Sequence, residues 1–373
     1  MAEIVGKIVL TGGPCAGKTT ALARIEEDLQ EKGYYVLIVS ESATELIKGG
    51  IKPFGDNAIK MFDFQKLIVE YQLNKEKTYE EAIKLLPNDK KCIIVYDRGV
   101  MDNKAYVSDS EFADILKQLD LNQLYLLDRY DMVIHLVTAA DGKEEYYTLS
   151  NNQARTETVE QAKQMDKKSL KAWTGHNNLV IIDNRTDFED KMKNVLDSIH
   201  NLLGNPIPLK RQKIYAIDIN NSLIPDCDEI KLEYFYLENC DKYERRLKKR
   251  TQNNQTTYYL TVQSRNKGLS KIVTDKKITA KEFERLLSSQ NVKATLKKSR
   301  YCFSQNKQYF KLDILSESNI GLLQVDVTQD NSKIILPKEL KVLEEVTDDI
   351  NYQSYNIALR KNQKVKVKTI STN

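Results

Sequence analysis

One stretch decides the fold of the first half of this chain: Gly12-Gly13-Pro14-Cys15-Ala16-Gly17-Lys18-Thr19-Thr20. It follows the apolar run 8–10 and precedes a segment with helical character, 21–25. A strand, then G-x-x-x-x-G-K-[ST], then a helix is the arrangement of a phosphate-binding loop. Glycines let backbone N–H groups turn inward around a phosphate, and the helix directs its positive end at the anion. All nine residues are therefore candidates for nucleotide binding.

A second element completes the expected apparatus about 80 residues later. The apolar strand 92–96 ends in Asp97, and a carboxylate at this place binds the shell of a Mg²⁺ ion. Thr19 would place its hydroxyl on the same ion, and Lys18 would bridge the β- and γ-phosphates. The expected ligand is ATP or GTP with Mg²⁺. No N-K-x-D element is present to select guanine.

Apolar runs alternate with helical segments between these motifs, which predicts an α/β domain with a parallel sheet. We expect strands at 4–11, 34–39, 92–96, 132–137 and 179–183. We expect helices at 19–31, 57–76, 78–86 and 188–203.

Two further residues are candidates for catalysis beside Lys18 and Asp97. Glu41 follows a predicted parallel strand, where ligands gather, so it could hold a substrate hydroxyl or a metal-bound water. An equally weighted alternative is a carboxylate at a helix start. Arg155 lies in a basic excursion, 138–175, where P-loop kinases carry a lid, and could stabilise a transferring phosphoryl group. The alternative for Arg155 is a surface salt-bridge network.

The length of 373 residues predicts two domains. We expect a P-loop domain at 1–204, a Pro/Gly-containing linker at 205–212, and a second domain at 213–373. Residues 210–373 hold 31 Lys/Arg and 20 Asp/Glu, a net charge of +11, whereas residues 1–209 hold 26 and 33, a net charge of −7. A basic half favours a polyanionic partner, and a solvated lysine-rich surface is the alternative.

The composition indicates a cytoplasmic protein. Five scattered cysteines and three dispersed histidines fit a reducing compartment and argue against a zinc site. The phosphate-binding loop begins within a dozen residues of the start, and no apolar run approaches the roughly 20 residues of a transmembrane helix. Association with the periphery of a membrane, or with a cytoskeletal or organellar assembly, remains open. Nothing predicts a nucleic-acid partner.

The second half changes period. Strand-like segments recur at 230–237, 243–250, 256–264, 270–274, 293–303, 308–315 and 320–327, with one helix at about 279–288. This predicts an α+β domain or a closed antiparallel barrel. Basic residues occupy alternate positions in two of these strands, so each set would lie on one face of its strand. The sets are Arg246, Lys248 and Arg250, and Lys298 and Arg300. If that face is the inside, these five would hold an anionic ligand; if it is the outside, they are a solvated surface.

The first half resembles a known family through several motifs. They are 11–20, the Glu41 turn, Asp97-Arg98-Gly99 with Asp102, 139–142, Asn152-x-x-Arg155-x-Glu157 and Trp173-x-Gly175-His176. Together they are similar to the AAA-like P-loop domain related to nicotinamide riboside kinase. The resemblance covers nearly all of residues 5–204 and implies a kinase-like P-loop NTPase.

The second half resembles a degenerate CYTH domain, the triphosphate-tunnel fold. The matching segments are 245–250, 259–261, Lys298-x-Arg300-Tyr301, 312–313 and 345–352. Where that family opens with E-x-E-x-K, this chain reads Lys231-Leu232-Glu233-Tyr234-Phe235, and Gln324-Val325-Asp326 stands where a metal-binding E-x-E pair is expected. Loss of metal-binding carboxylates predicts that this half does not cleave triphosphate.

The combination of the two domains is similar to the TRPL translocation defect protein family. That resemblance implies GTP binding by the first half and phosphatidic acid binding by the second. Our leading hypothesis is a Mg²⁺-dependent nucleotide-binding regulator whose second domain binds an anionic phospholipid or polyphosphate. The alternatives are a small-molecule, nucleoside-type kinase and a structural subunit that binds protein partners in a larger assembly.

Overall fold

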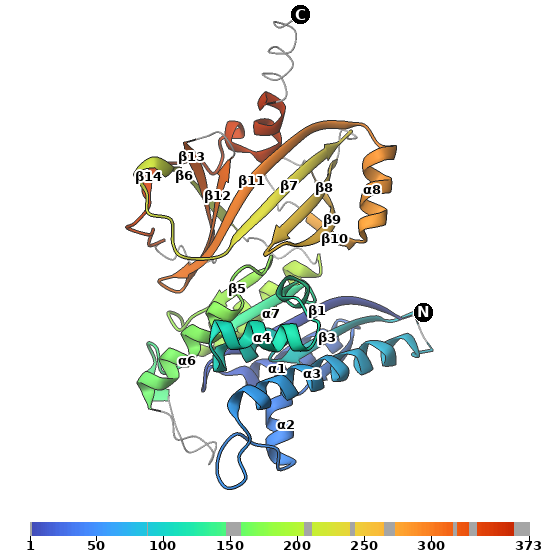
Figure 1. Ribbon diagram of the computed structural model, residues 1–373, viewed down its shortest axis with the longest axis vertical. Coiled ribbons are helices and arrows are strands. Elements are labelled where there is room, and N and C mark those ends of the chain that lie inside the picture. Colours follow the sequence, from blue (N-terminus) through green and yellow to red (C-terminus); the bar gives the residue numbers. More distant parts are fainter. Residues whose placement is uncertain are drawn as a thin grey trace, which may run out of the picture. The chain divides into compact units, whose positions relative to one another are not determined.

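The computed structural model of this chain describes residues 2–87, 89–146, 158–204, 211–238, 243–264, 273–315, 319–327 and 334–361. The chain divides into two units, Met1–Ile207 and Pro208–Asn373, which the colours of Figure 1 separate into blue to green and yellow to red. Most of the predicted linker, 205–210, lies outside the described residues, and strand β6 begins at Arg211.

A five-stranded parallel sheet forms the centre of the first unit, which confirms the predicted α/β P-loop fold. Its order is β2-β3-β1-β4-β5. The strands are β1 (Glu3–Gly12), β2 (Tyr35–Val39), β3 (Lys91–Asp97), β4 (Met132–Leu136) and β5 (Leu179–Ile182). Because all five run the same way, their carboxyl ends meet at one edge, and that edge carries the candidate site.

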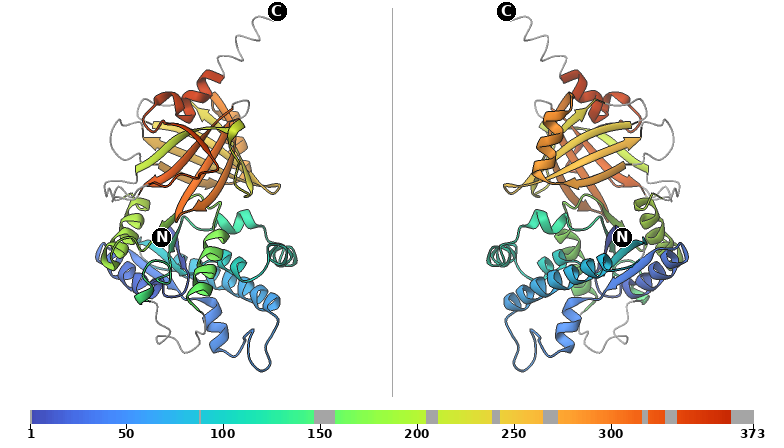
Figure 2. Two further views of the ribbon diagram at one scale, coloured as in Figure 1. Left: turned by 90° about the vertical axis from the view of Figure 1, so that its left-hand side faces the viewer. Right: turned by 90° about the vertical axis from the view of Figure 1, so that its right-hand side faces the viewer.

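Helices cover both faces of this sheet (Figures 1 and 2). On one face, α1 (Lys18–Glu31) and α7 (Phe188–Leu202) pack Ile25 and Ile199 against Ile8 and Leu10. On the other face Tyr96 stacks edge-on against Tyr130, whose hydroxyl donates to Glu76 of α3. The remaining elements are α2 (Ser42–Lys48), α3 (Met61–Lys84), α4 (Asp109–Gln118), α5 (Gln123–Leu127), α6 (Val159–Ala172), and the short 3-10 turns η1 (Val100–Tyr106) and η2 (Glu144–Tyr146).

The prediction of two helices at 57–76 and 78–86 is wrong, because α3 is continuous from Met61 to Lys84. Its buried positions continue through the expected break. Glu76 is fully buried there, and its Oε2 forms an ion pair with Arg129 Nη2 at 2.7 Å. Glu76 therefore belongs to the buried stripe of α3, and its charge does not end the helix.

The second unit contains a nine-stranded antiparallel sheet, a helix at 280–289 and helical residues 354–361, as the predicted α+β domain requires. The order of the sheet is β10-β9-β8-β7-β11-β12-β13-β6-β14. The strands are β6 (Arg211–Asp218), β7 (Glu229–Leu237), β8 (Tyr243–Gln252), β9 (Gln255–Ser264), β10 (Val273–Ile278), β11 (Val292–Gln305), β12 (Gln308–Leu315), β13 (Ile320–Val327) and β14 (Lys341–Glu345). Two short 3-10 turns accompany them, η3 (Ile219–Asn221) and η4 (Ile350–Tyr352).

The sequence missed β6 and β14, and the closed barrel is not formed by the described strands. No ladder between β10 and β14 joins the two ends of the sheet in the part of the chain that the structure describes. The helix α8 (Ala280–Ser289) packs Phe283 and Leu286 against Leu237 and Leu247. These apolar residues define one face of the sheet, the α8 face, and α8 is seen on it in Figure 2. On the opposite face Tyr236 packs edge-on against Tyr355 of the helical residues 354–361.

Within the described ranges, no helix combines the length and the apolar character needed to cross a membrane.

Candidate phosphate-binding sites

The phosphate loop lies between β1 and α1, and two of its glycines adopt backbone angles that favour glycine. Gly12 has φ +141° and Gly17 has φ +90°. A Cβ on Gly12 would lie 2.1 Å from the carbonyl oxygen of Leu136. Gly17 directly precedes α1, a helix of 14 residues whose first N–H groups have no intrahelical partners. The loop therefore presents backbone donors and a helix N-terminus at the same place.

Lys18 curls back over the loop that precedes it. Its Nζ donates to the carbonyl oxygens of Gly12 and Gly13, both at 3.0 Å. Burial, followed by the nearby guanidinium of Arg98, lowers the pKa of Lys18 to about 8. An ammonium that is partly desolvated and beside another cation gains most from an arriving anion. Thr19 and Thr20 follow in the first turn of α1, and both are exposed.

Asp97 ends β3, the strand that pairs with β1, and its partner across the ladder is Leu10. Its Oδ1 is buried and has no hydrogen-bond partner among the described residues. Burial and the neighbouring Glu41 raise the pKa of Asp97. A buried carboxylate oxygen without a partner fits a metal-bound water or a hydroxyl proton that arrives with a ligand.

Glu41 precedes α2 and is joined to the end of β3. Its Oε1 accepts from Arg98 Nε at 2.6 Å, and its Oε2 accepts from Thr44 Oγ1 at 2.6 Å. Glu41 occupies the N-cap position of α2, but its side chain makes no cap hydrogen bond. Although burial alone raises it, the pKa of Glu41 is lowered overall by Arg98 and Thr44. The structure thus brings Glu41, Asp97 and Lys18 into one electrostatic neighbourhood at the carboxyl edge of the sheet.

Asp102 bonds to groups that adjoin this site. It accepts hydrogen bonds from Thr11 Oγ1, from the Gly99 N–H at 2.9 Å and from Trp173 Nε1 at 3.2 Å. Its contact with Arg98 is longer, 3.5 Å. Asp102 therefore holds the turn after β3 and is saturated with donors. The predicted Arg155 lies outside the described residues.

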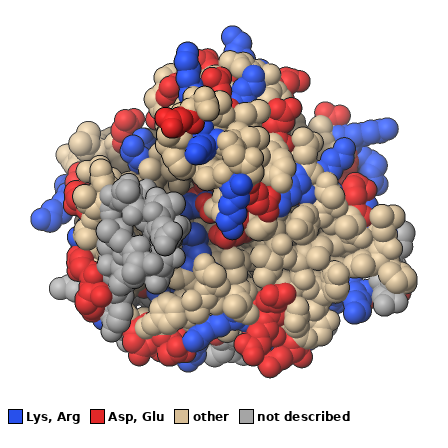
Figure 3. All heavy atoms as spheres, turned by 90° about the horizontal axis from the view of Figure 1, so that it is seen from below, with Lys and Arg blue, Asp and Glu red and all other residues tan. Residues whose placement is uncertain are grey.

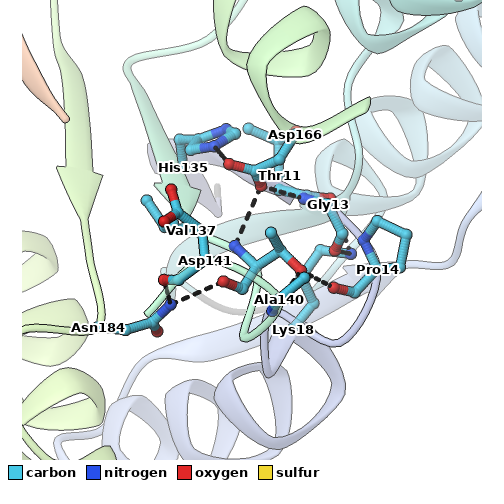
Figure 4. A network of polar contacts seen from close by, with 12 residues as sticks. Thr11, Gly13, Pro14, Lys18, His135, Val137, Ala140, Asp141, Asp166 and Asn184 are labelled. Carbon is cyan, nitrogen blue, oxygen red and sulfur yellow. Dashed lines mark hydrogen bonds and ion pairs between the residues drawn. The ribbon is translucent and has the colours of Figure 1, made fainter. Parts of the chain in front are cut away.

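Sequence reasoning missed a polar network that contacts the phosphate loop (Figure 4). Asp166 of α6 accepts from the Gly13 N–H at 2.7 Å and from the Thr138 N–H at 3.1 Å, and contacts His135 Nε2 at 3.3 Å. His135 is a buried, hydrogen-bonded histidine of the core, as its apolar surroundings in the sequence predict. Nothing in the local sequence marks Asp166, because its partners lie 28 to 153 positions away.

The second candidate site lies on the face of the nine-stranded sheet opposite α8, here called the polar face. The ladders place Arg246, Lys248 and Arg250 opposite Tyr236, Tyr234 and Leu232. The same ladders place Lys298 opposite Leu232 and Arg300 opposite Ile230. Paired residues share a face, so all five predicted cations lie on the polar face. Lys248, Arg250 and Lys298 are buried there.

Part of this positive charge is neutralised within the sheet. Lys298 Nζ lies 2.6 Å from Asp313 Oδ2, and Arg300 Nε lies 2.6 Å from Asp313 Oδ1. Lys248 pairs with Asp275. The two cations beside it hold the pKa of Asp313 well below its usual range even though burial alone would raise it.

The pKa of Tyr234 indicates that the polar face keeps a net positive potential near this side chain. Lys298 Nζ lies 4.7 Å from the centre of its ring, and the Arg246 guanidinium lies 4.9 Å from it. Burial alone would raise the pKa of the phenol, but Lys298, Arg300 and Arg246 lower the pKa of Tyr234 to about 8. The potential at this hydroxyl is therefore positive, in spite of the carboxylate of Asp313.

Lys231 and Phe235, which the sequence comparison set against an E-x-E-x-K motif, do not lie on the polar face. Phe235 packs against Phe283 on the α8 face, and the alternation places Lys231 on that same face. The positions of β7 on the polar face are Ile230, Leu232, Tyr234 and Tyr236. Gln324 does lie on the polar face, where its amide donates to Asp313 at 3.2 Å. In the described part of the chain, no group of three or more His, Cys, Asp or Glu side chains could hold a metal ion.

The surface of the first unit carries both signs of charge. On the face seen in Figure 3, Lys and Arg are interspersed with Asp and Glu. Mixed charges of this kind are typical of an ordinary solvated surface. The net negative charge of the first half is not gathered into a single patch on this face.

Comparison with solved structures gives likenesses to part of the chain. "The crystal structure of the hypothetical protein NE1496" is 24% identical, covers 40% of this chain and 96% of that chain, and has a TM-score of 0.29. "The crystal structure of the inorganic triphosphatase NE1496" is 24% identical, covers 41% and 95%, and has a TM-score of 0.30. A conserved hypothetical protein from Pyrococcus furiosus is 16% identical, covers 32% and 79%, and has a TM-score of 0.26. No curated protein matches the chain.

The first unit has a family match. Residues 7–191 match the family model described as an AAA domain. The matched range begins inside β1 and ends inside α7, so it contains the phosphate loop, Asp97 and all the loops at the carboxyl edge of the sheet. The first unit therefore contains an AAA-like P-loop domain.

Proposed function

We propose that the first unit binds a nucleoside triphosphate, ATP or GTP, together with Mg²⁺, and that the protein is a nucleotide-dependent regulator. The observation that carries this proposal is the state of Lys18. Its ammonium is held over the phosphate loop between two backbone carbonyls, with a pKa lowered by burial and by Arg98. A phosphate group would replace those weak acceptors with charged ones.

The residues present fit a magnesium ion. Thr19 supplies a hydroxyl at the start of α1, and Asp97 supplies a buried carboxylate oxygen that lacks a hydrogen-bond partner among the described residues. Hydroxyl, carboxylate and phosphate oxygens are the ligands that Mg²⁺ prefers. The ion would neutralise charge between the β- and γ-phosphates.

The hydrogen bonds and the lowered pKa of Glu41 favour a regulator with slow hydrolysis over a kinase. The two carboxylate oxygens of Glu41 already accept from Arg98 and Thr44, and its lowered pKa makes it a weak base. Asp97 favours the alternative of a small-molecule kinase, because its raised pKa and its unpartnered oxygen suit proton transfer from an acceptor hydroxyl.

We further propose that the polar face of the second unit binds an anionic, phosphate-bearing ligand but does not hydrolyse triphosphate. Support comes from the positive potential at Tyr234 and from the carboxylates Asp275 and Asp313, which are already engaged by Lys248, Lys298 and Arg300. Carboxylates held by cations are poorly placed to bind a divalent metal. The family resemblance suggests phosphatidic acid as the ligand.

The experiment that tests the first proposal is identification of the nucleotide that co-purifies with the chain, followed by calorimetric titration of the stripped protein with ATP and GTP. We expect the protein to carry a nucleotide that exchanges with free nucleotide in solution. We expect it to bind this nucleotide with full affinity only when Mg²⁺ is present. Protein that carries no nucleotide and binds neither triphosphate would contradict the proposal.

A further inference from the structure

A single carboxylate joins helix α6 to the phosphate loop. Asp166 is 6% exposed, and its Oδ1 accepts two backbone N–H groups, from Gly13 at 2.7 Å and from Thr138 at 3.1 Å. Its Oδ2 contacts His135 of β4 at 3.3 Å. One side chain therefore fixes the second residue of the loop, the residue that follows β4 by two positions, and the end of β4 itself (Figure 4).

The fit at Gly13 is close. A Cβ placed on Gly13 would lie 2.8 Å from Asp166 Oδ1 and 2.9 Å from Asp166 Cβ. Any residue larger than glycine would therefore push the carboxylate away from the N–H that it accepts. Gly13 has no positive φ, so the requirement for glycine at this position comes from space, which Asp166 limits most and Thr138 Cβ, at 3.2 Å, limits next.

Thr138 ties the loop a second time. Its Oγ1 donates to the carbonyl oxygen of Pro14, and the next N–H, that of Ala139, donates to the carbonyl oxygen of Cys15 at 3.2 Å. Asp166 bonds directly to the loop at Gly13 and, through the Thr138 N–H, to the segment 138–139 that is itself bonded to the loop. Cys15 stands at φ +53°, a strained angle that such bracing can maintain.

Placing a carboxylate beside an anion site is unfavourable unless its charge is compensated. Burial alone would raise the pKa of Asp166, but His135 and the N–H groups of Gly13 and Thr138 lower it overall. The carboxylate is therefore directed at loop backbone and at His135, and its charge is satisfied there. Its role is support of the loop and not contact with the phosphate.

We propose that Asp166 is a positioning residue for nucleotide binding, which fixes the Gly13–Pro14 backbone so that the following N–H groups of the loop converge on phosphate, and which couples helix α6 to the state of that loop. This inference rests on the proposed nucleotide binding for its functional consequence. Its structural half, the order of the loop, can be measured without any nucleotide.

The first test is hydrogen exchange of the full-length protein without ligand, followed in the peptide that covers residues 11–17. Asp166→Ala removes both accepted bonds, so we expect exchange in this peptide to accelerate at least about tenfold. Asp166→Asn keeps an oxygen in the Oδ1 position, so we expect it to remain close to the wild type. Glu160→Gln, at an exposed position of the same helix, is the matched control and should change nothing.

The second test is calorimetric affinity for Mg²⁺-ATP, Mg²⁺-GTP and inorganic pyrophosphate. We expect Asp166→Ala to weaken all three by a similar factor, at least about tenfold, because the loop is common to them, and Asp166→Asn to restore most of it. Gly13→Ala should cause the same loss by displacing the carboxylate. Combined with Asp166→Ala it should add little, since both changes break one contact.

The results that would overturn the inference are specific. Wild-type exchange and affinity in Asp166→Ala would do so, as would an asparagine variant as impaired as the alanine variant. If Asp166→Ala does not fold, Gly13→Ala alone decides: unchanged loop protection in it contradicts the proposal. A wild-type protein that binds no nucleotide would defeat the proposed function, while the exchange experiment would still decide the role of Asp166.

Discussion

Arg98 Nε donates to Glu41 Oε1 at 2.6 Å, and this bond joins the carboxyl ends of β3 and β2. Arg98 stands at φ +67° and its N–H donates to the carbonyl oxygen of Leu10, so three neighbouring strands meet at this residue. The pair leaves Glu41 ionised and immobilised beside Lys18. Glu41 can therefore orient a group that arrives at this edge, but it cannot readily take a proton from it.

A screen of nucleosides and nicotinamide riboside with labelled ATP and GTP tests the regulator against the kinase. We expect no phosphorylated product. We also expect Glu41→Gln to change nucleotide affinity by less than about threefold, since Glu41 contacts Arg98 and Thr44 and not the loop. A product that the wild type forms and that Glu41→Gln fails to form would establish the kinase and contradict the regulator.

Nucleotide binding should take up protons near pH 8. The pKa of Lys18 in the free protein is about 8, so a fraction of the amine is neutral at that pH. A bound triphosphate favours the ammonium and raises this pKa, so affinity should be retained below pH 8 and fall as the pH rises above it. Titrations at pH 8 in buffers of different ionisation enthalpy measure the uptake directly. Heats that do not depend on the buffer would contradict the assignment.

The first site could be predicted where its residues are consecutive or end a strand. The loop 12–20 and Asp97 are found because a glycine-rich turn and an apolar strand ending in Asp are local patterns. Asp166 could not be found in this way. Asp166 accepts from Gly13, 153 positions away, and only the parallel order of β1 and β4 brings α6 to the loop.

The ion triad of Lys298, Arg300 and Asp313 should dominate the stability of the second unit. Asp313→Ala leaves two cations without their shared carboxylate, one of them buried, and we expect a loss of about 3–5 kcal/mol in the free energy of unfolding. Asp348→Ala, at an exposed position, is the control and should cost less than about 0.5 kcal/mol. Urea denaturation measures both. A loss below about 1 kcal/mol for Asp313→Ala would refute this account of the triad.

The same triad fixes the direction of a pH effect. The folded pKa of Asp313 is depressed well below its unfolded value of about 3.9. Its contribution is therefore fully present above that pH and is lost as the pH falls below it. The stability difference between wild type and Asp313→Ala should shrink only in acid below about pH 4. A difference that shrinks between pH 5 and pH 8 would contradict this.

Anion binding by the polar face is tested in full-length protein that carries Lys18→Ala, which silences the first site. Arg246→Gln should weaken binding of tripolyphosphate and of vesicles containing phosphatidic acid by at least about fivefold, because Arg246 lies over Tyr234 on the polar face. Arg245→Gln, one position along on the opposite side of the strand, is the matched control. Binding should weaken with salt, since charge attraction is screened. Equal losses in both variants, or indifference to salt, would rule out this site.

Tyr234 supplies an optical check on the same site. Its pKa of about 8 should appear as tyrosinate absorbance that Tyr234→Phe abolishes. A bound anion offsets Lys298, Arg300 and Arg246, so the titration should move to higher pH when tripolyphosphate is added. Tripolyphosphate that binds without moving this titration would place the anion elsewhere.

The second unit shows where a strand pattern is sufficient and where it fails. Alternation of Arg246, Lys248 and Arg250 predicts one face within β8, but only the ladders through β7 show that Lys298 and Arg300 share it. The face of Lys231 likewise follows only from the ladders, because a shift of one residue would move every side chain to the other face. The strands β6 and β14 were missed; β6 pairs with β13 and with β14, and β14 pairs with β6.

Calorimetric titration of wild type and Lys18→Ala with Mg²⁺-ATP and Mg²⁺-GTP tests the central claim most directly. Lys18 is held by loop carbonyls and not by the core, so Lys18→Ala should fold as the wild type does, and Lys48→Ala, exposed at the end of α2, serves as the control for loss of a lysine. We predict that wild type and Lys48→Ala bind a triphosphate with the same affinity and that folded Lys18→Ala binds none. Equal binding by wild type and Lys18→Ala would contradict the account.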